Sequence, residues 1–428
     1  MGHDHSHGDA PPITDERTQT ILSVVVGVLA LVTLAGLVLL WPSGDTDIKA
    51  DELGLGAELV DATVTSVEEV PCFGTDEAMG FRCDLVTFDV TSGSVAGEEG
   101  SLELHRGEAA VTLEPGDRIV VGYQADLDFP ARYYFDDFQR DVPLLALGAA
   151  FVVAVLLLGR WQGLRALLGL VVTGVVVVTF LFPSLLDGNS ATTVALTAAS
   201  VIALTALYLT HGVSERTTVA LLGILVALAV TAGLAALFTT WAEFTGFATE
   251  DAVYLQVASS NVDIRGLVLA GIIIGSLGVL DDVTVTQVSA VWQIHRANPG
   301  YSARRLYQAG VAIGRDHIAS TVNTLVLAYA GASLPLLLVY TQGGRSLAEV
   351  ANGELVASEI VRTLVGSIGL ITAVPITTAL AAWVITRGAA GSSAPDPEAV
   401  PDRAPEPAAE GEGEGDGPSW EDFAPREP

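Results

Sequence analysis

Apolar segments about as long as a membrane is thick recur along the chain. A helix needs about 20 mostly apolar residues to cross the roughly 30 Å hydrocarbon core of a bilayer. Half of the 428 residues are hydrophobic, and the mean hydropathy is +0.50. The pattern predicts a membrane all-α bundle of about eight transmembrane helices, with the lipid bilayer as its first partner. The predicted spans are 21–41, 142–158, 164–182, 192–210, 219–240, 266–285, 318–340 and 364–386.

Arginine residues fall mainly in alternate loops between these spans. Because cytoplasmic loops carry an excess of Lys and Arg, this predicts a multi-pass protein of the cell membrane with both termini in the cytoplasm. Span 21–41 is followed by no small-residue cleavage site, which favours a signal anchor over a cleaved signal peptide. Arg265, Arg345 and Arg362 stand on the predicted outer side, against the trend. The arginines that follow the trend are Arg17, Arg160, Arg165, Arg216, Arg296, Arg304, Arg305, Arg315 and Arg387.

Polar and apolar residues alternate in the segment 45–140, which lies between the first two spans. The alternation is clearest over 58–67, 83–90, 101–105 and 118–123. A period of two residues is typical of strands with one buried face. We therefore expect a small extracytoplasmic β module of short antiparallel strands, for which a five-stranded barrel of the OB type is one candidate.

The only two cysteines of the chain, Cys72 and Cys83, both lie in this module. On the oxidising side of the membrane, a disulfide is the natural interpretation of such a pair. A metal-binding or redox pair is the less favoured alternative, because the spacing is not Cys-x-x-Cys.

Acidic residues dominate the net charge of −30 and concentrate in 42–142 and 389–428. Neither segment suits nucleic acid, because phosphates are bound by Lys and Arg. The second segment is rich in Pro, Gly, Ala and Glu, and a chain of this composition buries too little apolar surface to fold. We expect it to be an acidic, disordered cytoplasmic tail.

Histidines alternate in the first segment, 1–20, at His3, His5 and His7. Short His-rich tracts can hold a borderline metal ion such as zinc. A cytoplasmic terminus without order is the competing interpretation. No other cofactor is implied by the sequence.

Two adjacent carboxylates, Asp281 and Asp282, interrupt the sixth predicted span. A charged residue at bilayer depth costs about 2.5–3.5 kcal/mol on insertion scales, so it marks a candidate functional site. The competing interpretation places Asp282 in the inner third of the span, where its side chain reaches the headgroups. At helical spacing Asp282 shares one face with small residues that allow close helix approach and with polar residues. This face comprises Gly271, Gly275, Gly278, Asp282, Thr286 and Ser289.

A second polar face precedes and enters the seventh predicted span. Asp316, Ser320 and Asn323 have the spacing i, i+4, i+7 and share a helix face. Arg315, at the cytoplasmic mouth, is a candidate ion-pair partner that would neutralise Asp282. In the last span Pro375 removes a helical hydrogen bond and predicts a kink.

Three motifs in order resemble the YibE/F-like multi-pass membrane proteins. They are GSLGVLDDV at 275–283, GRDHIASTVNTL at 314–325 followed by AYAG at 328–331, and EIVRTLVGSIG at 359–369 before Pro375. The resemblance extends over about 50–386. It implies a seven-helix membrane domain over 142–386 and a permease of uncharacterised substrate. Its single intramembrane Asp matches Asp282, and Asp281 stands where the family more often has an apolar residue.

The sequence contains no P-loop, no Gly-x-Ser-x-Gly and no His-Glu-x-x-His, so we do not expect an enzyme. The favoured function is a secondary transporter or permease for an unknown small solute or ion, with Asp282 binding a proton or cation. The alternative is an envelope accessory or scaffold protein whose β module binds a protein partner. The residues expected to line the path or gate are Asp282, Thr286, Ser289, Arg315, Asp316 and Asn323.

Overall fold

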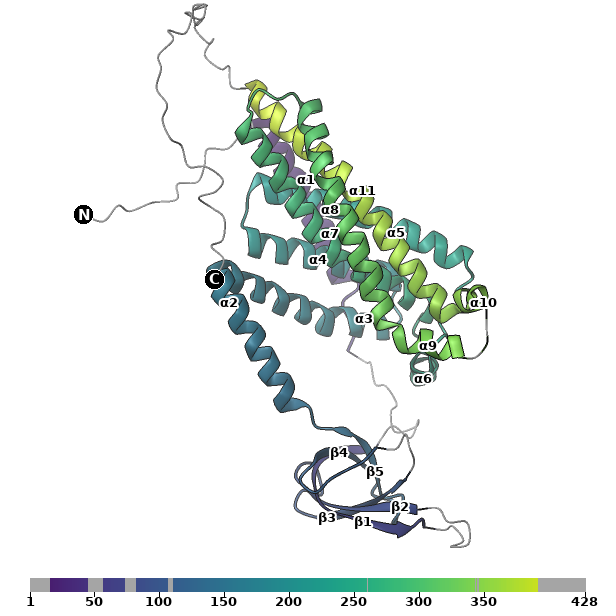
Figure 1. The fold of residues 1–428 in the computed structure, drawn as a ribbon. Coiled ribbons are helices and arrows are strands. Elements are labelled where there is room, and N and C mark those ends of the chain that lie inside the picture. Colours follow the sequence, from purple (N-terminus) through teal and green to yellow (C-terminus); the bar gives the residue numbers. More distant parts are fainter. Residues whose placement is uncertain are drawn as a thin grey trace, which may run out of the picture.

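The computed structural model describes residues 16–44, 57–73, 82–106, 111–259, 261–342, 344 and 346–391. The histidine tract with His3, His5 and His7 and most of the acidic tail lie outside these residues. A β module lies at one end of the molecule and a bundle of long helices forms the rest (Figure 1).

The β module is one antiparallel sheet with the strand order β3-β2-β1-β4-β5. Alternate residues of β1 and β2 point into a shared core, among them Val60, Val64 and Phe88, all at most 2 % exposed. The sheet curls so that its outer strands, β3 and β5, approach each other. This confirms the short strands expected from the alternating pattern. The strands are β1 (Glu58–Pro71), β2 (Arg82–Val90), β3 (Glu99–His105), β4 (Arg118–Tyr123) and β5 (Tyr133–Phe138).

The turn after β2 is held by a carboxylate at the start of β1. Glu58 accepts hydrogen bonds from the backbone N–H of Ser94, at 2.6 Å, and from the Ser94 hydroxyl. These bonds favour the charged carboxylate and lower the pKa of Glu58 below its usual value of 4.5. Because the folded pKa is lowered, this contact stabilises the module above pH 4.5 and is lost as the pH falls through the folded pKa.

Cys72 and Cys83 form a disulfide that joins the end of β1 to the start of β2. It closes a loop with a sequence separation of 11 residues. On the chain-entropy model such a loop contributes about 3 kcal/mol. We expect the double variant Cys72→Ala, Cys83→Ala to lower the free energy of unfolding of the β module by about this amount. Denaturant unfolding of the full chain, followed by protease resistance of the module, measures it; an unchanged midpoint would contradict the prediction.

Twelve helical elements are found in the described part of the chain, and most belong to the bundle. Six are long and apolar enough to cross a membrane, and a bent pair, α8 with α9, makes up to seven. The elements are α1 (Glu16–Leu39), α2 (Asp141–Val176), η3 (Val177–Leu181), α3 (Phe182–Leu186), α4 (Ala191–His211), α5 (Glu215–Trp241), α6 (Glu250–Ala258), α7 (Ile264–Ala297), α8 (Ala303–Ala332), α9 (Leu334–Gln342), α10 (Leu347–Asn352) and α11 (Glu354–Gly391).

The second and third predicted spans lie within one helical segment that bends sharply at Arg160. There the backbone is non-helical, with φ 49° and ψ −124°, and the two arms of α2 diverge from this point (Figure 1). A Cβ on Gly163 would lie 2.4 Å from the backbone oxygen of Val155, so only glycine fits this close approach. The bend therefore coincides with the sequence 159–163, in which Arg, Trp and Gln stand between two glycines.

The seventh predicted span, 318–340, is divided in the structure. α8 begins earlier, at Ala303, and ends at Ala332, and α9 continues at an angle of 63°. Pro335 is the second residue of α9 and has no N–H to donate to the preceding turn, so the helix breaks just before it. The predicted span over 318–340 therefore corresponds to a bent pair of helices, and its beginning lies inside α8.

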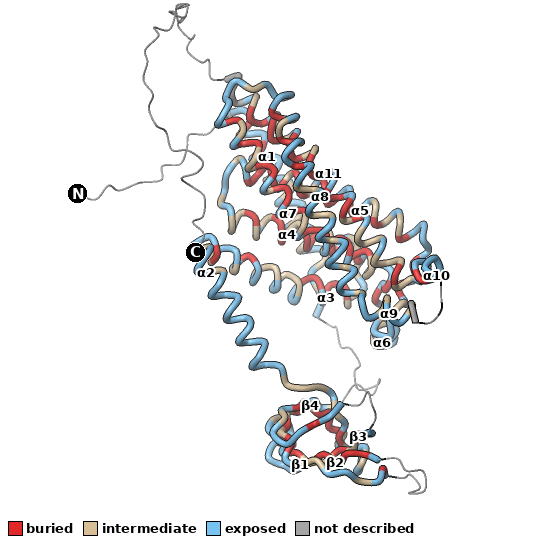
Figure 2. The backbone as a smooth tube through the Cα atoms, viewed as in Figure 1, coloured by how far each residue is buried: buried red, intermediate tan, exposed pale blue. Residues whose placement is uncertain are grey.

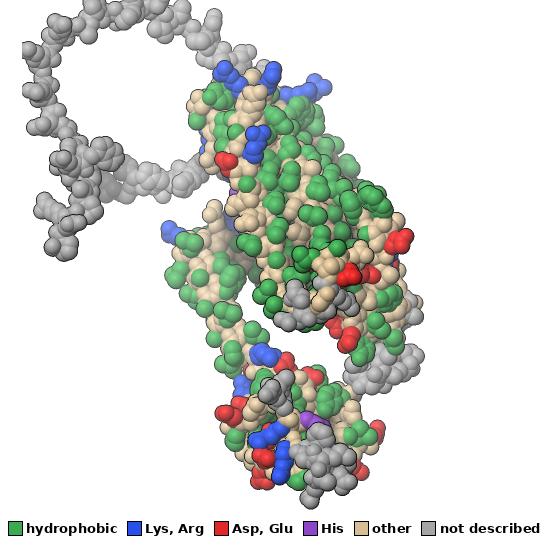
Figure 3. Space-filling view, turned by 45° about the vertical axis from the view of Figure 1, so that its right-hand side comes forward, with side chains coloured by type: hydrophobic (Ala, Val, Ile, Leu, Met, Phe, Trp, Pro, Cys, Tyr) green, Lys and Arg blue, Asp and Glu red, His purple; other side chains and the backbone are tan. Residues whose placement is uncertain are grey.

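The core of the bundle is built from α4, α5, α7 and α11, whose facing residues are buried (Figure 2). Side-chain hydrogen bonds join the ends of several helices. Gln19 donates a hydrogen bond to Glu215 at 3.0 Å, which joins the beginnings of α1 and α5. Glu354, the first residue of α11, accepts a hydrogen bond at 2.7 Å from the hydroxyl of Thr245, which lies between α5 and α6. Figure 3 shows Lys and Arg gathered at one end of the bundle and Asp and Glu at the other.

Candidate functional site

The acidic pair lies halfway along α7. The helix begins after Asp263, whose side chain accepts a hydrogen bond from Gly266 N–H at 2.9 Å, and continues to Ala297. At 1.5 Å per residue, Asp282 is about 27 Å from the first residue and about 22 Å from the last. α7 extends well beyond the predicted end at 285, so Asp282 is central in the helix.

The two carboxylates of the pair have different surroundings. Asp282 and Thr286, one turn later, are exposed on the surface of the bundle. Asp281 is half-buried, and its Oδ1 is buried with no hydrogen-bond partner among the described residues. Neighbouring residues on a helix are rotated by about 100°, which explains the difference. Ser289 lies further along α7 beside a small cavity that also touches His211 and Arg216.

The glycine face of α7 leaves room for side chains of other helices. A Cβ on Gly271 would lie 3.6 Å from Nη2 of Arg362, and one on Gly275 would lie 3.5 Å from the hydroxyl of Tyr329. Nothing described lies within 4 Å of a Cβ on Gly278. Close packing of another helix backbone along this face therefore stays a prediction. The glycines at 271 and 275 instead leave room for the side chains of Arg362 and Tyr329.

The polar residues of α8 point away from the bundle. Arg315, Asp316 and Asn323 are exposed. Asp316 and Asn323 are rotated by about 200° and 180° from Gly314, the buried face of α8. In the described part of the chain, no ion pair within 4.0 Å joins Arg315 to Asp282. The structure thus does not bring the two polar faces together, and their joint path is a proposal below.

A buried amide, which the sequence analysis missed, connects three helices. Gln287 on α7 donates hydrogen bonds to the Gly310 carbonyl oxygen on α8, at 2.8 Å, and to Thr378 Oγ1 on α11, at 2.7 Å. Gly310 and Gly314 let α8 approach this amide closely. An uncharged amide inside an apolar helix is stable only when its donors are satisfied, so this contact fixes the three-helix unit α7–α8–α11.

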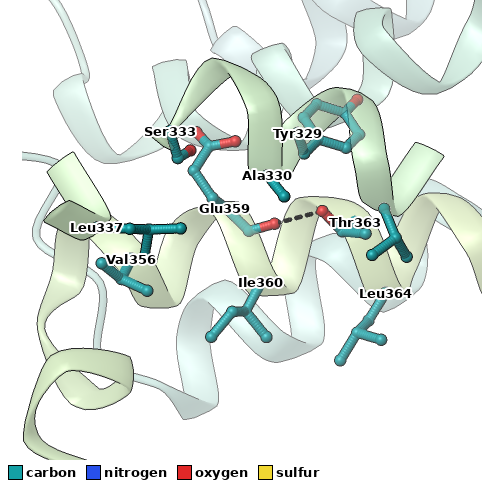
Figure 4. A pocket seen from close by; sticks show the side chains of 10 residues that line it. Tyr329, Ala330, Ser333, Leu337, Val356, Glu359, Ile360, Thr363 and Leu364 are labelled. Carbon is teal, nitrogen blue, oxygen red and sulfur yellow. Dashed lines mark hydrogen bonds between the residues drawn. The ribbon is translucent and has the colours of Figure 1, made fainter. Parts of the chain in front are cut away.

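A cavity of about 350 Å³ opens between α8, α9 and α11, at the break between α8 and α9 (Figure 4). This volume is within the usual range of small-molecule sites, about 300–1,000 Å³. Its walls are mostly apolar, and Glu359 is the one carboxylate among them. The lining residues are Val326, Tyr329, Ala330, Ser333, Leu337, Val356, Glu359, Ile360, Thr363 and Leu364.

Glu359 forms an ion pair with Arg362, which does not itself line the cavity. Its Oε1 lies 3.0 Å from Nη1 of Arg362, one turn along α11. Both side chains are under 30 % exposed, and the Nε of Arg362 is buried without a partner among the described residues. Because Nη2 of Arg362 also reaches Gly271, this ion pair links the cavity to the glycine face of α7.

The fold and this site define a helical protein of the membrane-embedded type, with a small antiparallel β module and polar groups inside its bundle. A model of the YibE/F-like protein family matches residues 147–387, more than half of the chain. The chain belongs to the YibE/F-like family, as its motifs predicted. The match includes the residues of α7, α8 and α11 discussed above. It does not include the β module, whereas the resemblance predicted from the sequence extended over about 50–386. Neither the curated proteins nor the solved structures contain a match.

Proposed function

We propose that this protein is a permease that moves a small solute or ion across the cell membrane along the three-helix unit α7–α8–α11. The cavity beside the α8–α9 break carries the proposal, because broken helices and intramembrane charges together are typical of transport sites. Glu359 and Arg362 line or support that cavity. Two further carboxylates, Asp281 and Asp282, lie halfway along α7.

In this proposal the chain crosses the membrane eight times, with both termini in the cytoplasm. The bend at Arg160 makes α2 two crossings, and α8 with α9 supplies the seventh. The separation of basic and acidic residues at opposite ends of the bundle supports the orientation. Asp282 binds a proton or cation, while Thr286, Ser289 and Asn323 line the path. Arg315 and Asp316 act at the cytoplasmic mouth.

A cysteine at position 286 tests whether the exposed face of α7 meets water. Both native cysteines are bonded to each other, so an introduced thiol reacts alone. Thiolates form only where water reaches. We expect Thr286→Cys to react at least about tenfold faster than Val226→Cys with a membrane-impermeant methanethiosulfonate reagent. Val226 is the matched control, because it is 45 % exposed on α5 in an apolar segment. Equally slow reactions would favour a dry interface and the scaffold function.

The β module supports a second candidate function, binding of a protein partner outside the membrane. We propose that the module is a barrel of the OB type, since β1 pairs with both β2 and β4 while β3 approaches β5. Phe73 and Phe129 are 65 % and 43 % exposed, with ring centroids 5.8 Å apart. Exposed aromatic residues are enriched at interfaces. Removal of residues 45–140 should spare a permease's flux and abolish a scaffold's function.

A further inference from the structure

We propose that the cavity between α8, α9 and α11 binds a small organic cation with an apolar body, and that Glu359 holds its positive charge. The inference rests on the proposed permease function, for which it names the class of substrate. It is carried by the walls of the cavity, by the position of its single carboxylate and by the partner of that carboxylate.

The walls select an apolar body. Six of the ten lining side chains are aliphatic, from Val326 and Ala330 on α8 to Ile360 and Leu364 on α11. A strongly polar solute would lose its hydrogen bonds to water there and recover few of them. An apolar body fills the same volume favourably, because burial removes its surface from water.

The carboxylate selects a positive charge. Figure 4 shows the side chain of Glu359 extending along the cavity toward Ser333, while its backbone oxygen accepts a hydrogen bond from Thr363. Among the ten residues that line the cavity, Glu359 is the only acidic one, and none is Lys, Arg or His. In surroundings of low dielectric constant, a carboxylate attracts a cation and repels an anion more strongly than it does in water.

Arg362 neutralises the charge of Glu359, and a cationic ligand can displace it from that carboxylate. It is a positioning residue, because it contacts Glu359 from behind and is absent from the cavity lining. Its Nη2 already lies beside Gly271, where no side chain competes for the space. A bound ammonium group would contact the carboxylate of Glu359, either together with Arg362 or in its place. Arg362 would then move further toward α7. Binding in the cavity is thereby connected to the helix that carries Asp281 and Asp282.

Benzyltrimethylammonium tests the charge and the apolar body together, since its charge does not depend on pH. We would measure equilibrium binding of the radiolabelled cation to the full chain in lipid nanodiscs, with empty nanodiscs subtracted. Unlabelled neopentylbenzene, the neutral compound of the same shape, and benzenesulfonate, an anion, serve as competitors. We expect saturable binding that neither competitor displaces at concentrations where the unlabelled cation does.

Two variants separate the charge from the shape of the cavity. Glu359→Gln keeps the size of the side chain and should weaken binding of the cation by about tenfold or more. Ala330→Trp should block the cavity while leaving the Glu359–Arg362 pair in place. Glu250→Gln, an exposed acid-to-amide change on α6, is the control and should bind as the wild type does. Thermal unfolding of each variant verifies that it is folded.

Unchanged binding in Glu359→Gln, or equal competition by neopentylbenzene, would overturn the inference and leave a purely apolar cavity. Binding that survives Ala330→Trp would place the cation elsewhere and would also overturn it. Failure of the permease function gives a different result. Saturable, Glu359-dependent binding without any flux in vesicles would keep the cation site and contradict transport, whereas flux without cation binding would do the reverse.

Discussion

Replacing Gly314 with alanine should lower the free energy of unfolding of the helical bundle by about 1–3 kcal/mol. The added Cβ would lie 2.5 Å from Cγ1 of Val374 and 2.7 Å from Oε1 of Gln287. Val374 is buried and branched, so it cannot move away cheaply, and Gln287 is held by its two hydrogen bonds. Thermal unfolding in detergent, followed by tryptophan fluorescence, measures the loss.

Gly278→Ala is the matched control for this variant. It makes the same change in the same three-helix unit, but nothing described lies within 4 Å of the new Cβ. Because alanine favours a helix over glycine by about 1 kcal/mol, this variant should be as stable as the wild type or more stable. Equal destabilisation by both substitutions would mean that α8 does not pack on Gln287 and Val374 as described.

Replacing Asp282 with asparagine should abolish proton-coupled flux while leaving the abundance and stability of the protein unchanged. Asparagine keeps the shape of the side chain but neither ionises nor releases a proton. Asp282 is exposed, and no described ion pair depends on it, so little packing is lost. Asp251→Asn, on the exposed helix α6, is the matched control and should retain full flux.

Much of the fold was predictable because each element obeys a local rule. Apolar length predicted the long helices, and alternation predicted β1, β2, β3 and β4, with the core side chains of Val60 and Phe88 on one face. The breaks were harder. Apolar content alone does not distinguish a straight span from one divided near Pro335. The proline was the available signal for the break, but the prediction used only the length of the apolar segment.

The candidate site was only partly predictable. The sequence predicts an intramembrane position for Asp282, but the exposure of its side chain depends on how the neighbouring helices pack on α7, and no local rule supplies that. Arg362 was read as an exception to the distribution of arginines. Its spacing from Glu359 was the available signal, because residues three apart on a helix can pair. Gln287 gave no signal of its own, since only the glycines of α8 make its contacts possible.

The most direct test of the permease function is proton flux in vesicles that contain the purified full chain and a pH-sensitive dye. Wild-type protein and Asp251→Asn should carry flux above that of empty vesicles, and Asp282→Asn should show none. Full flux in Asp282→Asn would remove this carboxylate from the mechanism. Absence of flux from the folded wild type, across imposed gradients of pH and of benzyltrimethylammonium, would contradict the permease function itself.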